Sequence, residues 1–232
     1  MKYLILSIIV LSLACSKKDQ VKGVQSAIYV VNASPNSGKL QVLQNLKAIG
    51  AADYAYVTGI NSNISSYQLI DSGFNHYKIK KGTTEFANTL FSNQSAKLSF
   101  WIYDSISATK IKYLFLKDQL DTPGRAKAKV RYLFLSPDMD TVNVTGNNAT
   151  TNLYNNASYF LSQQLVDGGN LASFVTIDTG FVLLKLVKKN TSVIIKSYQL
   201  RFESNQVYTV LFKGYQKRTG ADSLSLSVIK HN

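Results

Sequence analysis

Several residue types on which active sites depend are scarce in this chain of 232 residues, which contains one Cys, two His, three Pro and one Trp. A single Cys excludes an internal disulfide and a metal site built from several thiolates, so packing must hold the fold together. Two His offer little for acid–base catalysis, which needs a base held against a nucleophile or a substrate. We therefore expect no catalytic residues, no metal site and no cofactor.

Acidic residues are also few, since 13 Asp and Glu stand against 26 Lys and Arg, for a formal net charge of +13. In an intracellular protein this excess would raise nucleic acid as a partner. Only four of the cations are Arg, however, and recognition of phosphates and bases favours the planar guanidinium. We expect no nucleic-acid partner, and instead a Lys-rich solvated surface that is attracted to acidic surfaces.

The one Cys follows a short uncharged segment at the N-terminus. Lys2 precedes residues 3–14, a run that is too short to span a membrane because a spanning helix needs roughly 20 apolar residues. The order of a positive residue, an apolar stretch and small residues is typical of a secretory signal. The run ends in residues 12–15, Ser-Leu-Ala-Cys, which resemble the lipobox of bacterial lipoproteins.

This resemblance predicts residues 1–14 as a lipoprotein signal peptide and residues 15–24 as a tether that begins at lipidated Cys15. It implies a diacylglyceryl thioether and a further acyl chain such as palmitate, and several chains anchor a protein more firmly than one. By the same resemblance, Ser16 implies passage to the outer membrane, on its periplasmic or its cell-surface face. The alternative is an ordinary signal peptide with an incidental Cys.

The rest of the chain repeats itself. Three segments recur in the same order: residues 27–36 at 130–138, residues 70–74 at 177–181 and residues 92–94 at 204–206. Ordered matches of this kind indicate two units of one fold. Turn formers at residues 121–124 predict the join, which gives domains at residues 25–121 and 126–232. Since each half has its own strands, we expect residues 126–232 to fold when expressed alone.

Apolar and polar residues alternate in both halves. This period of two predicts β-strands, in segments rich in Tyr, Val, Ile, Phe and Thr. The predicted strands include residues 26–31, 74–79, 97–103, 127–134, 193–199 and 207–213. Seven or so short strands in about 100 residues are typical of a β-sandwich. The predicted fold is all-β, with two tandem Ig-like antiparallel β-sandwich domains after the signal peptide.

Short motifs in this pattern resemble the domain of unknown function 4397 family. They are a strand that ends in Ser-Pro-Asn or Ser-Pro-Asp, a middle strand that opens with Gly-Phe, and a late strand at residues 207–210, Val-Tyr-Thr-Val, followed by Gly214. Domains of that family occur in bacterial secreted and lipid-anchored proteins. The resemblance therefore agrees with the predicted address, and it implies no activity.

Three cations share one face of the predicted strand at residues 127–134. Lys127, Lys129 and Arg131 alternate with apolar residues, and successive side chains of a strand point to opposite faces. The simpler interpretation is a solvated outer face whose cations discourage pairing with other strands. The alternative is a binding site for an acidic ligand.

A second candidate site lies in residues 144–169, which form a long connection for a sandwich. Long loops often carry function. Aromatic rings can stack on the C–H faces of sugars while amides bond to hydroxyls, which makes Tyr154, Asn155, Asn156 and Tyr159 candidate ligand-binding residues. The alternative is a polar loop that covers one end of the sandwich.

The remaining titratable residues form no recognisable catalytic set. His76 lies in a predicted strand with Leu183 at its repeat position, and His231 is the penultimate residue. Asp71 and Asp178 recur in an Asp-Ser/Thr-Gly sequence, which is typical of a turn.

We therefore expect a non-catalytic lipoprotein that acts as a binding or structural module at the outer membrane. Its expected partners are the membrane, through the lipid anchor, and a polysaccharide or another envelope protein. A surface glycan-binding accessory lipoprotein and a hydrolase with an unrecognised site are the alternatives.

Overall fold

A computed structural model describes residues 25–50, 53–58, 67–93, 97–107, 110–147, 152–159, 164–166 and 173–231. Cys15 and the predicted signal peptide and tether lie outside these residues. Strands make up nearly all of the regular secondary structure in the described part, with one 3-10 helix at Gly220–Asp222, so the predicted all-β class is confirmed. Within it, no helix has the length and apolar character needed to span a membrane.

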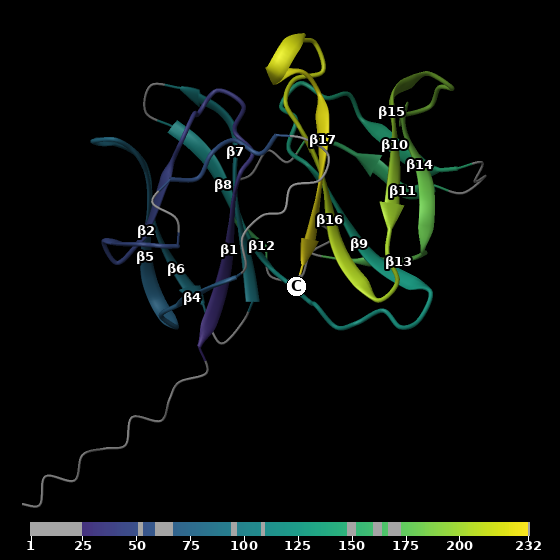
Figure 1. Cartoon of the computed structure of the whole chain (residues 1–232). Coiled ribbons are helices and arrows are strands. Elements are labelled where there is room, and N and C mark those ends of the chain that lie inside the picture. The colour runs from purple at the N-terminus through teal and green to yellow at the C-terminus, as the bar shows by residue number, and fades with distance from the viewer. Residues whose placement is uncertain are drawn as a thin grey trace, which may run out of the picture.

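The first half of the chain forms an outer and an inner sheet (Figure 1). Its strands are β1 (Ser26–Asn32), β2 (Gln41–Gln44), β3 (Lys47–Ala48), β4 (Gln68–Ile70), β5 (Gly73–Lys81), β6 (Thr84–Asn93), β7 (Lys97–Ser107) and β8 (Lys110–Lys117). Outer sheet 1 has the order β3-β2-β5-β6, and inner sheet 1 contains β8-β7-β1-β4.

The second half repeats this arrangement. Its strands are β9 (Lys127–Phe134), β10 (Val142–Gly146), β11 (Asn152–Ala157), β12 (Gln164–Val166), β13 (Val175–Asp178), β14 (Gly180–Lys188), β15 (Ile194–Phe202), β16 (Gln206–Lys213) and β17 (Ser225–His231). Inner sheet 2 is β13-β9-β16-β17 and outer sheet 2 is β11-β10-β14-β15. Strand β12 leaves its own half and pairs with β8, at the edge of inner sheet 1.

The two halves are tandem β-sandwiches, as the sequence predicts. The prediction of antiparallel sheets needs one refinement, because β1 pairs with β7 and β9 pairs with β16 in parallel. A parallel pair requires a crossover connection. Between β1 and β7 the chain forms the strands of outer sheet 1, and between β9 and β16 it forms the strands of outer sheet 2. The crossover connection of each parallel pair therefore builds the outer sheet of the same sandwich.

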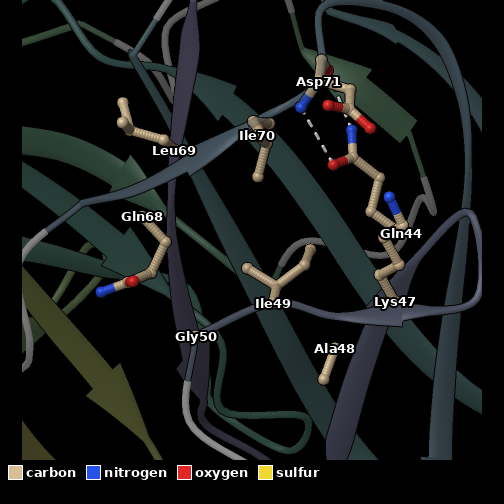
Figure 2. Close-up of a pocket in the computed structure, with 9 residues that line it drawn as sticks. All are labelled: Gln44, Lys47, Ala48, Ile49, Gly50, Gln68, Leu69, Ile70 and Asp71. Atoms are coloured by element: carbon tan, nitrogen blue, oxygen red, sulfur yellow. Dashed lines mark hydrogen bonds between the residues drawn. The ribbon is translucent and has the colours of Figure 1, made fainter.

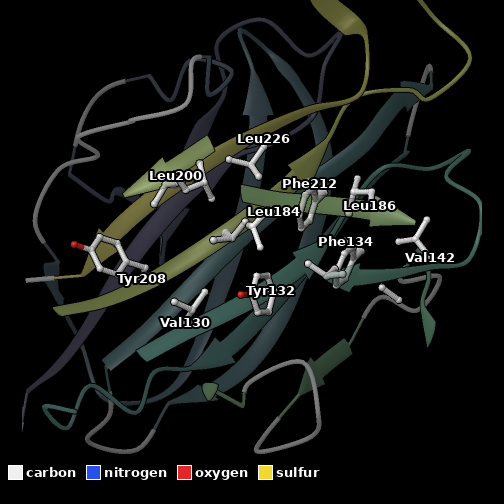
Figure 3. Packing of buried hydrophobic residues seen from close by; sticks show 14 of the residues in the cluster. Val130, Tyr132, Phe134, Val142, Leu184, Leu186, Leu200, Tyr208, Phe212 and Leu226 are labelled. Carbon is white, nitrogen blue, oxygen red and sulfur yellow. The ribbon is translucent and has the colours of Figure 1, made fainter. Parts of the chain in front are cut away.

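The four sheets stack as four layers with three apolar cores between them. One core, with Tyr77 and Phe100, fills the first sandwich. A second, with Phe134 and Phe212, fills the second sandwich (Figure 3). The third core lies between the inner sheets and contains residues of both halves, among them Trp101 and Leu133. The halves are therefore packed against each other over a buried apolar interface.

This interface explains the composition of the inner strands. A strand that is buried on both faces shows a nearly continuous apolar run instead of alternation. Strand β9 ends in Tyr132-Leu133-Phe134, where Tyr132 and Phe134 face the second sandwich core and Leu133 faces the first half. In β1, Ile28 and Val30 face one core and Tyr29 and Val31 face the other.

The repeated Asp-Ser/Thr-Gly segments carry the chain from an inner to an outer sheet. They join β4 to β5 and β13 to β14, which lie in different sheets, so the predicted turns are corners between layers and not hairpins. Gly73 has a φ of 100° and Gly180 a φ of 112°. Such values are strained for any residue with a Cβ atom, which explains why Gly stands at both corners.

Candidate functional site

The predicted basic face is turned toward the other half of the molecule. All three cations are paired with carboxylates: Lys127 with Asp178, Lys129 with Asp121, and Arg131 with Asp118. Arg131 is fully buried, so its assignment to a solvated face is wrong. The three cations do alternate with apolar residues, but burial increases along this face of β9 from Lys127 to Arg131, where the face packs on inner sheet 1.

Arg131 is the centre of a polar cluster in the interface. Its Nη1 donates to Asp118 Oδ1 at 2.7 Å, and its Nη2 donates to Ser99 Oγ at 3.1 Å. Thr209 Oγ1 accepts from Nε and Nη2 at 3.2 and 3.0 Å. The guanidinium also lies 4.7 Å from the ring centroid of Phe174. A buried charge requires such pairing, because desolvation costs several kcal/mol per ion.

His231 and Tyr67 close the cluster into a ring. The Tyr67 hydroxyl donates to Asp118 Oδ2 at 2.7 Å and lies 2.9 Å from His231 Nδ1. His231 Nε2 lies 2.8 Å from Thr209 Oγ1. Since the Tyr67 proton is used on Asp118, Nδ1 must carry the histidine proton and Nε2 must accept from Thr209. The ring is therefore complete with a neutral His231.

This polar ring comprises six side chains, three from each half: Tyr67, Ser99, Asp118, Arg131, Thr209 and His231. All are buried except Tyr67, which is partly buried. Trp101 Nε1 also donates to Ser99 Oγ at 2.8 Å. Nε, Nη1 and Nη2 of Arg131, both carboxylate oxygens of Asp118 and both ring nitrogens of His231 bond to other members, so the ring binds the two halves to each other.

The sequence shows no role for His231, the penultimate residue, but the structure places it inside the interface. Burial lowers its pKa from 6.5 to about 4, against the opposing effect of Asp118. Burial and the charge of Asp118 raise the pKa of Tyr67 well above its usual range. The alternating apolar residues of β17, which end at His231, were the signal that the C-terminus is a buried strand.

Stability should fall in mild acid because of His231. A histidine with a depressed folded-state pKa binds its proton mainly in the unfolded state, so stability is complete above pH 6.5 and is lost as the pH falls toward about 4. The loss should be on the order of 3 kcal/mol. Urea denaturation between pH 4 and pH 8 measures it, and His231→Gln should flatten this part of the profile.

The matched control is His76→Gln, because His76 is exposed on outer sheet 1. Carboxylates titrate in both variants, so the difference between the two profiles isolates His231. Identical profiles for the two variants would show that His231 does not couple folding to pH.

The aromatic residues of the second candidate site do not form a common platform. The ring of Tyr154 lies on the core of the second sandwich, 5.3 Å from the centroid of Phe134. Tyr159 donates from its hydroxyl to Asp104 at 2.7 Å and packs against the interface core. The two rings therefore pack against different cores, and together they do not form a flat surface on which a sugar could stack.

The segment at residues 144–169 is also not one long loop. It contains β11 and β12, which extend two different sheets. Asn155 and Asn156 are exposed in β11. Asn156 has a φ of 53°, and its backbone N–H donates to Asn143 Oδ1 at 3.0 Å. Since Asn tolerates a positive φ better than most residues, this position has a structural reason for its amide.

An open cleft lies beside the first corner, between β3 and β4 (Figure 2). Its volume is about 170 Å³, and nine residues line it: Gln44, Lys47, Ala48, Ile49, Gly50, Gln68, Leu69, Ile70 and Asp71. The Gln44 amide donates to Asp71 O at 2.9 Å and accepts from Asp71 N at 3.1 Å. The polar floor of the cleft thus serves to hold the corner.

A cleft of about 230 Å³ occupies the equivalent place in the second half, beside Ile177 and Asp178. Where Gln44 pairs with Tyr77 in the first half, Gly146 pairs with Leu184 in the second. Leu153 fills the space next to Gly146. The two clefts are related by the repeat but differ in chemistry, so the repeat does not encode one shared ligand.

The described residues contain no group of three or more His, Cys, Asp or Glu side chains that could hold a metal ion. Fold and polar ring together define a tandem β-sandwich protein whose two units are joined through their inner sheets. Residues 26–145, slightly more than half of the chain, match the family described as Domain of unknown function (DUF4397), and the chain belongs to this family. The search of curated proteins found no significant match.

Proposed function

We propose that this chain is a non-catalytic lipoprotein of the cell envelope that acts as a binding or structural module at the outer membrane. The observation that carries the proposal is the polar ring: among the residues that the structure describes, the side chains of Arg131, Asp118 and His231 form their hydrogen bonds with other members of the ring. Arg131, Asp118 and His231 bind the two sandwiches together, and they do so across a buried interface. Such an arrangement supports rigidity, which a spacer or docking module needs.

The surface left outside these contacts supports the same proposal. Lys78 pairs with Glu85 on outer sheet 1, and Lys188 pairs with Asp140 beside outer sheet 2. Exposed apolar residues interrupt this charged surface, among them Phe74 and Phe181. Isolated exposed apolar residues are common, but large ones at repeat-related positions suit contact with another surface.

The anchor is the part of the proposal that can be tested directly. Native protein purified from membranes should begin at Cys15 and carry acyl chains, because the tetrapeptide at residues 12–15 resembles a lipobox. Intact-mass spectrometry measures this. Cys15→Ala should give an unacylated product that no longer partitions with membranes.

The control for this experiment is Ser16→Ala, which keeps the thiol and should leave acylation intact. An unmodified thiol at Cys15 in the native protein, or membrane partitioning of Cys15→Ala equal to that of the native chain, would overturn the anchor.

A further inference from the structure

The two corners between layers each present an exposed phenylalanine. Phe74 follows Gly73 and is 77% exposed, and Phe181 follows Gly180 and is 65% exposed. Each is the second residue of an outer-sheet strand, at matching positions of the repeat. The guanidinium of Arg201 lies 5.6 Å from the centroid of the Phe181 ring.

The residues next to Phe74 and Phe181 have clear structural roles, but the two phenylalanine rings do not. Ile70 is buried in the first core, and Ile177 packs against the second. Gly73 and Gly180 supply the positive φ of the corner. Neither Phe74 nor Phe181 belongs to an apolar cluster of the described residues, so the repeated aromatic residue has no packing role that explains it.

Both corners lie at the same end of the molecule. In the first half, Ser26 at the start of β1 pairs with Ile70, three residues before the Gly73 corner. In the second half, Lys127 at the start of β9 pairs with Asp178. The bond between Tyr67 and His231 places these ends side by side across the interface. Figure 1 shows the start of β1, the C-terminal end and strand β13 in the lower part of the view.

The chain enters the fold at this end. The predicted tether, residues 15–24, has ten residues, which reach at most about 35 Å when fully extended. A further exposed apolar residue, Leu69, lies opposite Ala27 near the point of entry, with 69% of its surface exposed. The end that carries Leu69, Phe74 and Phe181 is therefore the end nearest to the tether.

The charge of this end suits an anionic lipid surface. Exposed cations stand at the start of β7 (Lys97), before β9 (Arg125) and opposite Phe181 (Arg201). Two of the acidic groups there, Asp178 and Glu203, are paired with Lys127 and Lys230. Cations near a membrane are attracted to anionic headgroups, while aromatic and aliphatic side chains enter the interface.

We propose that the end formed by the Gly73 and Gly180 corners rests on the lipid surface, with Phe74 and Phe181 inserted among the headgroups. The inference rests on the proposed function, since the anchor brings this end to the membrane. It adds an orientation: the strands of both sandwiches stand upright, and the β14–β15 turn, which lies at the opposite end, points away from the lipid.

The test uses the chain from residue 15 with Cys15→Ser, so that no acyl chain contributes to binding. Sedimentation with vesicles of phosphatidylcholine and phosphatidylglycerol at 3:1 should show salt-dependent binding, and vesicles of phosphatidylcholine alone should bind less. Phe74→Ser with Phe181→Ser should weaken binding at least tenfold, because the variant lacks the two aromatic rings whose transfer from water to the lipid surface favours binding. The melting temperature should stay unchanged, since both side chains are exposed.

The matched control is Val193→Ser with Ile194→Ser, at the β14–β15 turn. These residues are 56% and 51% exposed, and they lie at the far end of outer sheet 2. The control should bind as tightly as the parent chain. Equal losses in the two double variants, or no loss in either, would overturn the proposal.

A spectroscopic readout reports the orientation independently. Phe74→Trp should shift its emission to shorter wavelengths on vesicle binding and be quenched by brominated lipid, whereas Val193→Trp should not. Trp101 is fully buried and gives a constant background. Quenching at Val193→Trp and not at Phe74→Trp would reverse the orientation and overturn the proposal.

Failure of this inference and failure of the anchor give different results. If Cys15 is acylated in native protein but vesicle binding is insensitive to Phe74 and Phe181, the anchor stands and the contact is wrong. If the double Phe variant instead dissociates a dimer in analytical ultracentrifugation, these rings contact a second copy of the chain, which also overturns the lipid contact.

Discussion

Replacing Arg131 by alanine is expected to lower the free energy of unfolding by roughly 3–5 kcal/mol, because it leaves Asp118 charged and buried without its partner. Arg131 and Asp118 have no exposed side-chain surface, and 2.7 Å separates Nη1 from Oδ1. The substitution also removes the donors to Ser99 and Thr209. Urea denaturation at neutral pH measures the loss.

A double-mutant cycle separates the ion pair from the lost packing. Arg131→Met and Asp118→Asn should each cost several kcal/mol alone, while the variant that combines both should recover part of the loss, since no uncompensated charge then remains. Lys129→Ala is the matched control, because Asp121, the partner of Lys129, is largely exposed and such pairs contribute little. A loss at Arg131 no larger than at Lys129 would contradict a structural role for the ring.

The strands themselves could be predicted from the sequence. The strand predicted at residues 127–134 is β9, and the one predicted at residues 207–213 lies within β16 with one residue missing. The alternation of apolar and polar residues was sufficient to predict these strands because one face of most strands packs on a sandwich core. The repeat also placed the two Gly corners at equivalent positions.

The stacking of the two halves could not be predicted from that period. Alternation tells which residues share a face, and it does not tell whether the second face meets water or another sheet. The three cations of β9 alternate correctly, yet the face they share enters the interface, where Arg131 meets Asp118. The continuous apolar run from Tyr132 to Leu135 was the signal that both faces of β9 are covered.

The positions of the candidate ligand-binding residues could not be predicted from the sequence for a related reason. Tyr and Asn in a long connection suggest a ligand, but the rings of Tyr154 and Tyr159 pack against two different cores. Conversely, Tyr67, Thr209 and His231 come from three distant places in the sequence. Only the order of the sheets brings them together, and no local motif records that order.

The isolated second half, residues 126–232, is expected to associate with itself or to precipitate, contrary to the independence that the repeat suggests. Separation would expose Leu133, Leu135, Leu211 and Ile229, all buried in the interface core. It would also remove Asp118 from Arg131 and Tyr67 from His231. Analytical ultracentrifugation and amide spectra report the state of the fragment.

Addition of residues 25–121 should convert the fragment into a monomeric 1:1 complex, because the first half supplies the missing apolar face and the three remaining members of the ring. Substitution of Leu211 by a charged residue should have opposite effects on the isolated half and on the whole chain. Leu211→Lys should improve the solubility of the isolated half, since the side chain is then exposed, whereas in the whole chain it should cost several kcal/mol by burying an unpaired charge. An isolated half that stays monomeric and well folded, with no effect of Leu211→Lys on its solubility, would show that the two sandwiches are independent and that their interface contributes nothing to the stability of either.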